Sequence, residues 1–411
     1  MTSSHDPAPH GHTRSWGFAA LLASLAMLGP FAVDMYLPAF PAIGAEFGAS
    51  QIALQQTLSV YMFAYAFMML WHGALSDTLG RRPIVLGGLA VFAVGTLGCA
   101  ISGNIQSLWL FRVLQGLSAG AGLVVGRAII RDRFNGAEAQ RMMSQMTLVF
   151  GIGPAIAPII GGALLNLLGW RSIFWALLAW TLAMLVLAAR ALPETLPPAH
   201  RHALRPAALW RNYRAVIGQP KFALLALVPS LNFCGFFIYI AAAPTFLVDL
   251  LGVSTWGFAW LFVPMIAGIM IGAYTSGRLA GRVSPKKTVR AGYLLLTGGV
   301  IVNLLVSTFL PPMVAWNVLP IMIYTIGSSL IMPSVTLLLL DLFPTMRGMT
   351  SSLQGFVQFA LGGVIAGTIA PLLARALPLL AWGMAGFTAT GFALWLTYQR
   401  QARTTLKEWT P

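Results

Sequence analysis

Twelve apolar runs, each long enough to cross a lipid bilayer, constrain the fold of this chain more than any other feature. A helix needs about 20 apolar residues to span the hydrocarbon core of a membrane. Lipid offers no hydrogen bonds to the backbone, so helices are the form in which such runs cross it. The predicted spans are 15–38, 51–73, 84–103, 106–130, 142–166, 170–192, 221–247, 255–280, 288–310, 313–340, 347–373 and 378–400. The sequence therefore predicts an all-α integral membrane protein.

The charges of the chain favour a membrane protein over a nucleic-acid-binding one. Only 9% of the residues are charged and 58% are hydrophobic, whereas a soluble domain is about 25% charged. The net charge is +15, but the basic residues gather in alternate loops, as they do on the cytoplasmic side of membrane proteins. The basic residues of these loops include Arg81, Arg82, Arg131, Arg133, Arg141, Arg201, Arg205, Arg211, Arg214, Lys221, Arg278, Arg282, Lys286, Lys287, Arg290 and Arg347. We predict that both termini face the cytoplasm and that no nucleic acid binds.

The sequence predicts no metal or cofactor site. Cys99 and Cys234 both lie in apolar segments, at a spacing that indicates neither a disulfide framework nor a metal site. The histidines of the N-terminal tail, His5, His10 and His12, are expected to be solvated. The chain is expected to be a monomer.

A repeated cytoplasmic loop divides the chain into two halves. The segment Gly73–Pro83 follows the second span, and the similar segment Gly277–Lys287 follows the eighth, at an offset of 277 − 73 = 204 residues. Six helices plus six is the architecture of many secondary transporters. The predicted parts are a tail at 1–14, a six-helix bundle at 15–192, a cytoplasmic linker at 193–220, a pseudo-symmetric second bundle at 221–400 and a tail at 401–411.

Asp34 is a carboxylate inside the first apolar run. An ionisable group at membrane depth is unfavourable by several kcal/mol, roughly 2.5–3.5 on insertion scales, and by default marks a functional site. Arg112 in the fourth span is predicted at a similar depth, and we expect the two to form an intramembrane pair. Such a pair is able to couple proton release from Asp34 to substrate binding. The alternative is a structural ion pair that joins the first and fourth helices.

Four segments resemble a known family. Gly73–Pro83 resembles the signature loop of the major facilitator superfamily, and Arg112–Gly116 resembles its membrane-embedded Arg-x-x-Gln-Gly element. Gly153–Gly162 resembles the antiporter motif of drug exporters. Asp34–Pro38, together with Leu192–Thr195, resembles the Bcr/CflA group of drug:proton antiporters. The resemblance implies two six-helix bundles, alternating access and a multi-pass protein of the bacterial inner membrane.

The resemblance also implies two structural devices. The first is a conformational latch on the cytoplasmic side, formed by Gly73, Asp77, Gly80, Arg81, Arg82 and Asp132. The second is a helix seam that prevents leakage, formed by Gly153, Pro154, Pro158, Gly161 and Gly162. The alternatives are a solvated loop that only sets topology, and ordinary packing by glycine and proline, which are common in membrane helices.

A central cavity is predicted to bind the substrate through aromatic, methionine and amide side chains, which adapt to varied apolar ligands. The predicted binding residues are Asp34, Tyr61, Tyr65, Arg112, Gln115, Phe150, Asn232, Phe236, Tyr239, Phe262, Met265 and Gln358. Core packing is the alternative for each. The leading function is proton-coupled export of small, largely apolar drugs, because few polar residues lie at membrane depth. A proton-coupled carrier of a nucleoside, sugar or amino acid is the alternative, and an integral-membrane enzyme is the remote one.

Overall fold

The computed structural model describes residues 11–201, 203–344 and 346–407, and this part of the chain is helical without any strand. The N-terminal half contains α1 (Gly11–Asp34), η1 (Leu37–Ala39), α2 (Phe40–Phe47), α3 (Gln51–Leu79), α4 (Arg81–Ala100), α5 (Ile105–Ala119), α6 (Ala121–Arg133), α7 (Gly136–Leu168) and α8 (Arg171–Ala191). Twelve helical segments of the described chain are long and apolar enough to cross a membrane, which confirms the predicted fold class.

The two halves are joined by a segment that contains η2 (Pro198–His200) and α9 (Pro206–Ile217). The C-terminal half contains α10 (Pro220–Ala241), the π-helix η3 (Thr245–Leu250), η4 (Thr255–Phe258), α11 (Ala259–Leu279), α12 (Pro285–Phe309), α13 (Val314–Asp341), α14 (Arg347–Val364), the π-helix η5 (Ile365–Ile369), α15 (Ala370–Leu373) and α16 (Leu377–Lys407). Most of the predicted N-terminal tail, residues 1–10, and the last four residues of the C-terminal tail lie outside the described part.

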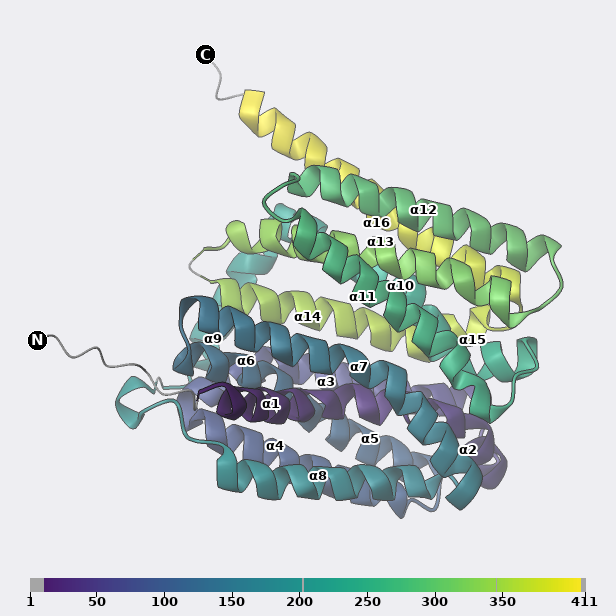
Figure 1. Cartoon of the computed structure of the whole chain (residues 1–411), viewed down its shortest axis with the longest axis horizontal. Helices are drawn as coiled ribbons and strands as arrows, with labels where there is room; N and C mark the ends of the chain where they lie inside the picture. The colour runs from purple at the N-terminus through teal and green to yellow at the C-terminus, as the bar shows by residue number, and fades with distance from the viewer. Residues whose placement is uncertain (1–10, 202, 345, 408–411) are drawn as a thin grey trace, which may run out of the picture.

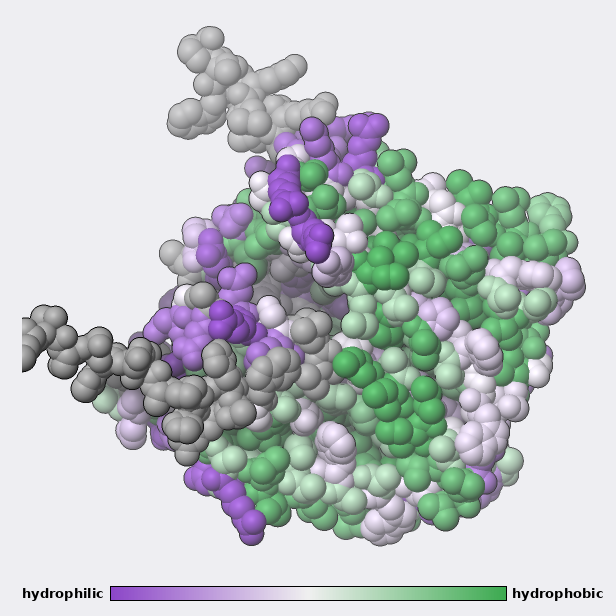
Figure 2. Space-filling view, viewed as in Figure 1, coloured by the Kyte–Doolittle hydropathy of each residue, from purple (hydrophilic) through white to green (hydrophobic). Residues whose placement is uncertain are grey.

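Figure 1 shows the two halves one above the other, with long helices running across the view and with the start of α1 and the end of α16 at the same side, the side of the chain ends. Within the N-terminal half α1 packs on α7, and α5 packs on α3 and α4. In the other half α13 packs on α11 and α12, and α10 packs on α16. The halves meet mainly where α3 contacts α14 and α7 contacts α11. Figure 2 shows a broad hydrophobic surface across these helices, with hydrophilic residues gathered at the side of the chain ends.

Several predicted spans differ from the observed helices; the second, for example, extends to Leu79, and the seventh passes from α10 into the π-helix η3. The first span does not end at residue 38 but continues through η1 and α2 to Phe47. Proline stands in the first turn of both short helices, where its missing N–H costs no hydrogen bond and its fixed φ suits a new helix. The span predicted at 106–130 is interrupted at Gly120, since α5 ends at Ala119 and α6 begins at Ala121, and the two helices together form one span, Ile105–Arg133.

The linker between the halves is anchored to the N-terminal half. The predicted linker 193–220 contains the helix α9, whose Tyr213 and Val216 are buried. The hydroxyl of the buried Tyr213 donates a hydrogen bond of 2.8 Å to the carbonyl oxygen of Leu70 in α3. This bond ties α9 to the side of the molecule where the chain ends lie (Figure 1).

Candidate functional site

A cavity of about 260 Å³ lies at the interface of the two halves. The N-terminal half contributes side chains from α1, α3 and α7, and the C-terminal half contributes them from α10, α11 and α14. The lining residues are Gly29, Pro30, Val33, Asp34, Tyr61, Met62, Tyr65, Phe150, Pro154, Phe233, Phe236, Phe237, Ile240, Met265, Ile266, Ile269, Gln358 and Phe359. The cavity is therefore predominantly apolar and rich in aromatic rings.

Asp34 is the only charged residue among those that line this cavity. It is the last residue of α1, and its exposed fraction is only 6%. In the part of the chain that the structure describes, its carboxylate forms neither an ion pair nor a hydrogen bond. A buried carboxylate without a partner is sensitive to whatever water, ion or ligand enters beside it.

Arg112 lies behind the wall of the cavity, and this corrects the predicted pairing with Asp34. Its side chain is fully buried, and its Nη1 donates to the carbonyl oxygen of Ala32 at 2.8 Å and to Oε1 of Gln115 at 3.0 Å. Its Nε donates to the carbonyl oxygen of Thr57 at 3.4 Å. The guanidinium group is thus held by neutral acceptors, and no ion pair joins it to Asp34.

Tyr61 lies beside both charged groups. The guanidinium carbon of Arg112 is 4.3 Å from the centroid of the Tyr61 ring, a cation–π geometry. Tyr61 also lines the cavity that contains Asp34, and its hydroxyl donates to the carbonyl oxygen of Gly29 at 2.9 Å. The same guanidinium carbon lies 4.8 Å from the centroid of the Tyr36 ring. Arg112 is therefore linked to the surroundings of Asp34 through the Tyr61 ring and through its hydrogen bond to Ala32 at the end of α1.

Seven of the predicted binding residues line the cavity, namely Asp34, Tyr61, Tyr65, Phe150, Phe236, Met265 and Gln358. The structure places the other five inside one bundle, namely Arg112, Gln115, Asn232, Tyr239 and Phe262, all of them at least 99% buried. Most of their polar groups have partners within that bundle, whereas Arg112 Nη2 and Asn232 Oδ1 are buried without a hydrogen-bond partner in the described residues. Gln115, for example, donates to Thr96 Oγ1 at 2.8 Å, and Tyr239 accepts from Asn303 at 2.6 Å. Aromatic or amide character alone does not tell which face of a helix points to the cavity.

Two phenylalanines of the cavity wall, Phe233 and Phe237, were not predicted to line it. The rings of Phe233 and Phe237 stack with centroids 5.0 Å apart, and Phe359 from α14 lies 6.3 Å from Phe233. Phe359 also contacts Tyr65 of the other half, at 4.6 Å between ring centroids. Phe233, Phe236 and Phe237 are three and four residues apart, so they share one face of α10, and this spacing could have identified Phe233 and Phe237 as neighbours of the predicted Phe236.

A second missed residue is Arg127 in α6, within the span Ile105–Arg133. Its side chain is exposed although both neighbouring residues are buried. It interacts electrostatically with Tyr65 of the cavity wall, and no ion pair with a carboxylate is found in the described chain. An arginine inside a membrane span is rare and usually functional, so the position of Arg127 in the predicted span 106–130 could have identified it.

The predicted latch residues form a compact charged cluster around Arg81. Its Nε donates to Asp132 Oδ2 at 2.8 Å, and its Nη1 donates to Ser76 Oγ at 2.8 Å and to Asp77 Oδ1. Arg81 is 7% exposed, and the bond to Asp132 is largely buried, whereas the carboxylate of Asp77 is half exposed. The cluster connects the ends of α3, α4 and α6.

Glu194 completes this cluster and was not predicted to belong to it. Its carboxylate accepts from the backbone N–H groups of Arg81 at 3.0 Å and Arg82 at 3.3 Å, which are the first residues of α4. A side chain at Gly80, whose φ is +105°, would lie 2.3 Å from Glu194 Oε2. Glycine is thus required at Gly80, whereas nothing lies near a side chain built at Gly73, so close packing does not explain that residue.

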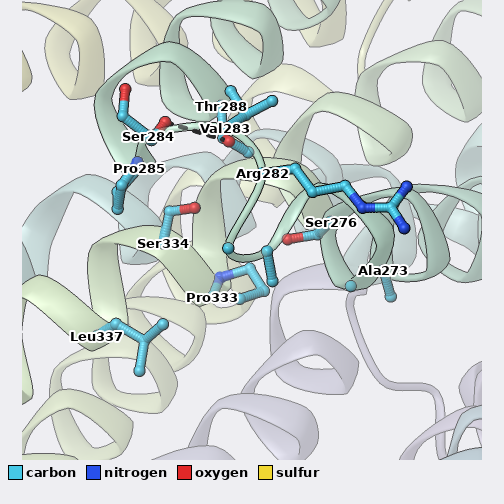
Figure 3. A pocket seen from close by; sticks show the side chains of 13 residues that line it. Ala273, Ser276, Arg282, Val283, Ser284, Pro285, Thr288, Pro333, Ser334 and Leu337 are labelled. Atoms are coloured by element: carbon cyan, nitrogen blue, oxygen red, sulfur yellow. Dashed lines mark hydrogen bonds between the residues drawn. The ribbon is translucent and has the colours of Figure 1, made fainter.

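The repeated loop in the C-terminal half lacks such a cluster. A pocket of about 570 Å³ opens between α11, α12 and α13, and Gly281 stands where the repeat has Asp77. Figure 3 shows Ser276 and Ser334 extending their hydroxyl groups into this pocket from opposite walls, while Arg282 extends away over Ala273. The charged latch is therefore a property of the N-terminal half.

The predicted seam residues of α7 allow two close approaches. A side chain at Gly161 would lie 2.1 Å from the carbonyl oxygen of Met35, and one at Gly162 would lie 2.8 Å from that of Thr255. Met35 follows α1, whereas Thr255 belongs to the other half. Pro154 lines the cavity, and Pro158 lies one turn further along the same helix.

Hydrogen bonds join the halves at the side opposite the chain ends. In α3, Gln56 Nε2 donates to the carbonyl oxygen of Gly367 at 2.9 Å, and Ser59 Oγ donates to that of Gly363 at 2.8 Å. Thr255 Oγ1 donates to Asn166 Oδ1 at 3.0 Å. Within the described residues, the cavity is thus closed by direct bonds between the halves on this side.

Two six-helix bundles with one cavity at their interface define a membrane transporter. The sequence profile of the Major Facilitator Superfamily matches residues 22–367, and the chain belongs to this superfamily. The fold and the family are those of transporters and not of enzymes, as predicted. The chain is a bacterial multi-pass membrane protein, while the orientation of its termini stays a prediction.

Individual relatives agree with this assignment. The chain is 33% identical over 349 residues to the uncharacterized MFS-type transporter YdgK of Bacillus subtilis, covering 84% of this chain and 87% of that protein. It is 29% identical over 358 residues to the bicyclomycin resistance protein homolog of Haemophilus influenzae, covering 86% of this chain and 89% of that protein. The latter similarity confirms the predicted likeness to the Bcr/CflA group.

A solved structure shares the fold. It is that of a bacterial homolog of the human lysosomal transporter Spinster in an inward-facing and occupied conformation. The two structures superpose with a TM-score of 0.73 at 18% sequence identity, over 99% of this chain and 100% of the other.

Proposed function

We propose that this protein exports small, largely apolar drugs across the bacterial cytoplasmic membrane in exchange for protons. The observation that carries the proposal is the single unpaired carboxylate of Asp34 in a small cavity lined mainly by aromatic and aliphatic side chains. The cavity walls suit an apolar ligand, because its binding removes apolar surface from water. The likeness to a bicyclomycin resistance protein homolog supports a drug as the cargo.

In the proposed cycle Asp34 carries the coupling proton. A drug that enters from the cytoplasm changes the surroundings of the carboxylate and releases its proton, and Asp34 is protonated again from the opposite side. Arg112 acts on this step as a positioning residue, since it holds Tyr61 and the end of α1. The hydrogen bonds between the halves break when the cavity opens away from the chain ends, and the Arg81 cluster latches the cytoplasmic side in one of the two states.

Proton release on drug addition tests this proposal. Purified protein in weakly buffered detergent is titrated with bicyclomycin, chloramphenicol, a lipophilic cation, a nucleoside, a sugar and an amino acid, with the Asp34→Asn variant beside the wild type. Release by a drug from the wild type alone supports antiport through Asp34. Equal release from the variant would place the coupling proton elsewhere. A response only to a nucleoside, sugar or amino acid would establish the metabolite carrier instead.

A further inference from the structure

A groove of about 470 Å³ lies between the first turns of α12 and the last turns of α16. Both helices lie at the outer edge of the C-terminal half, far from the N-terminal half, and these turns lie at the side of the chain ends (Figure 1). The groove therefore faces the surrounding lipid and not the cavity between the halves.

Three cations line one end of this groove, namely Lys286, Lys287 and Arg290. All three side chains are exposed, and none of them forms an ion pair in the part of the chain that the structure describes. Unpaired cations at this depth attract the anionic surface of the cytoplasmic leaflet. Figure 2 shows hydrophilic residues at this end of the helices, directly beside hydrophobic surface.

The rest of the groove is mostly apolar, with Gln399 and Thr297 as its polar residues, and it continues along α12 away from the cations. Lys286, Arg290, Leu294 and Thr297 lie at intervals of four, four and three residues and so share one face of α12. They cover about 16 Å of helix length at 1.5 Å per residue. Across the groove α16 presents Phe392, which is 43% exposed and whose ring contacts Tyr293 at 4.9 Å.

We propose that this groove binds an anionic phospholipid. The phosphate of the headgroup lies at Lys286, Lys287 and Arg290, and an acyl chain lies along Leu294 and Phe392. A positive end followed by an apolar channel matches such a lipid in both charge and shape, and basic pockets between membrane helices are known to bind lipid headgroups. Charges that only set the topology of the chain need no groove beside them. The proposal does not depend on which substrate is transported.

Lipid binding to the purified full chain tests the site. The probes are phosphatidylglycerol and phosphatidylethanolamine, and the bound lipid is measured by native mass spectrometry during titration. The variant Lys286→Gln/Lys287→Gln/Arg290→Gln loses about fivefold in phosphatidylglycerol affinity per cation, so roughly a hundredfold in total. The control Arg205→Gln/Arg211→Gln/Arg214→Gln removes the same charge near α9 and retains the affinity. Equal binding by all three proteins, or no preference over phosphatidylethanolamine, would overturn the proposal.

A second arm separates a lipid from a free phosphate. Thr297→Trp fills the apolar channel without changing any charge, so it weakens phosphatidylglycerol binding at least tenfold if an acyl chain lies there. If Thr297→Trp binds as the wild type does and inorganic phosphate displaces the lipid, the groove is a soluble-anion site and the proposal is wrong. The charge-preserving variant Lys286→Arg/Lys287→Arg/Arg290→Lys retains binding, which shows that the loss follows the charges, and an unchanged melting temperature of the neutral variant excludes misfolding.

Discussion

Replacing Asp34 by asparagine is expected to leave the stability of the protein nearly unchanged. The physical reason is that no cation pairs with Asp34, because the guanidinium group of Arg112 is held by Ala32, Thr57 and Gln115. Asparagine has almost the shape of a protonated aspartic acid, and the replacement leaves no partner charge without its counter-charge. Had the two residues formed a buried ion pair, removing one partner would cost about 3–5 kcal/mol.

The expected shifts in melting temperature follow from the size of the chain. An unfolding entropy of about 2.1 cal/mol/K per residue gives roughly 0.9 kcal/mol/K for 411 residues. Breaking an ion pair would therefore lower the melting temperature by about 3–6 °C, whereas we expect less than about 1 °C for Asp34→Asn. Arg112→Met leaves three buried acceptors unsatisfied at about 1–3 kcal/mol each and is expected to lower the melting temperature by about 3–10 °C.

The assay is thermal unfolding of the purified protein in detergent, followed by tryptophan fluorescence. Asp34→Asn, Arg112→Met and the double variant form a cycle, and the exposed Asp249→Asn is the control. We expect a coupling energy below about 0.5 kcal/mol between the two sites. A coupling above about 2 kcal/mol, together with a large loss for Asp34→Asn alone, would show that an ion pair exists and would refute the reasoning.

Three further predictions follow from the packing. Gly162→Ala places a methyl group against the backbone of the other half and should lower the transport rate at least tenfold at normal expression. The control Gly151→Ala has open space around it and should transport at the wild-type rate. Equal transport rates of the two variants would contradict a close approach at Gly162. Glu194→Ala leaves two backbone N–H groups of α4 without their acceptor and should cost about 1–2 kcal/mol in thermal or denaturant unfolding. Phe359→Ala should weaken drug binding in an isothermal titration with little loss of stability. Phe262 is fully buried, so Phe262→Ala should lower the free energy of unfolding by about 3–5 kcal/mol. The reverse pattern would mean that the cavity lies elsewhere.

The charged residues of the candidate site were predictable, because a charged side chain inside or beside a membrane span has few possible roles. An aspartate in an apolar run and a charged loop between two spans both stand out against lipid. The participation of Glu194 was not predictable in the same way. Glu194 lies in a loop more than 100 residues after Arg81 in the sequence, and the two residues meet only because α8 packs along α4. The pairing of Asp34 with Arg112 was wrong because depth in the membrane does not tell which side of Tyr61 a side chain occupies.

By itself the sequence determined the membrane class, the number of spans and the division into halves, since hydrophobic length and charge asymmetry are local properties of the chain. It also determined that Asp34 is an isolated carboxylate in an apolar run. Only the tertiary structure decided which aromatic residues face the cavity, which acceptors hold Arg112, and that Gly162 touches the other half. These features depend on the rotation of each helix about its axis and on contacts between helices distant in sequence, and no local pattern specifies either of them.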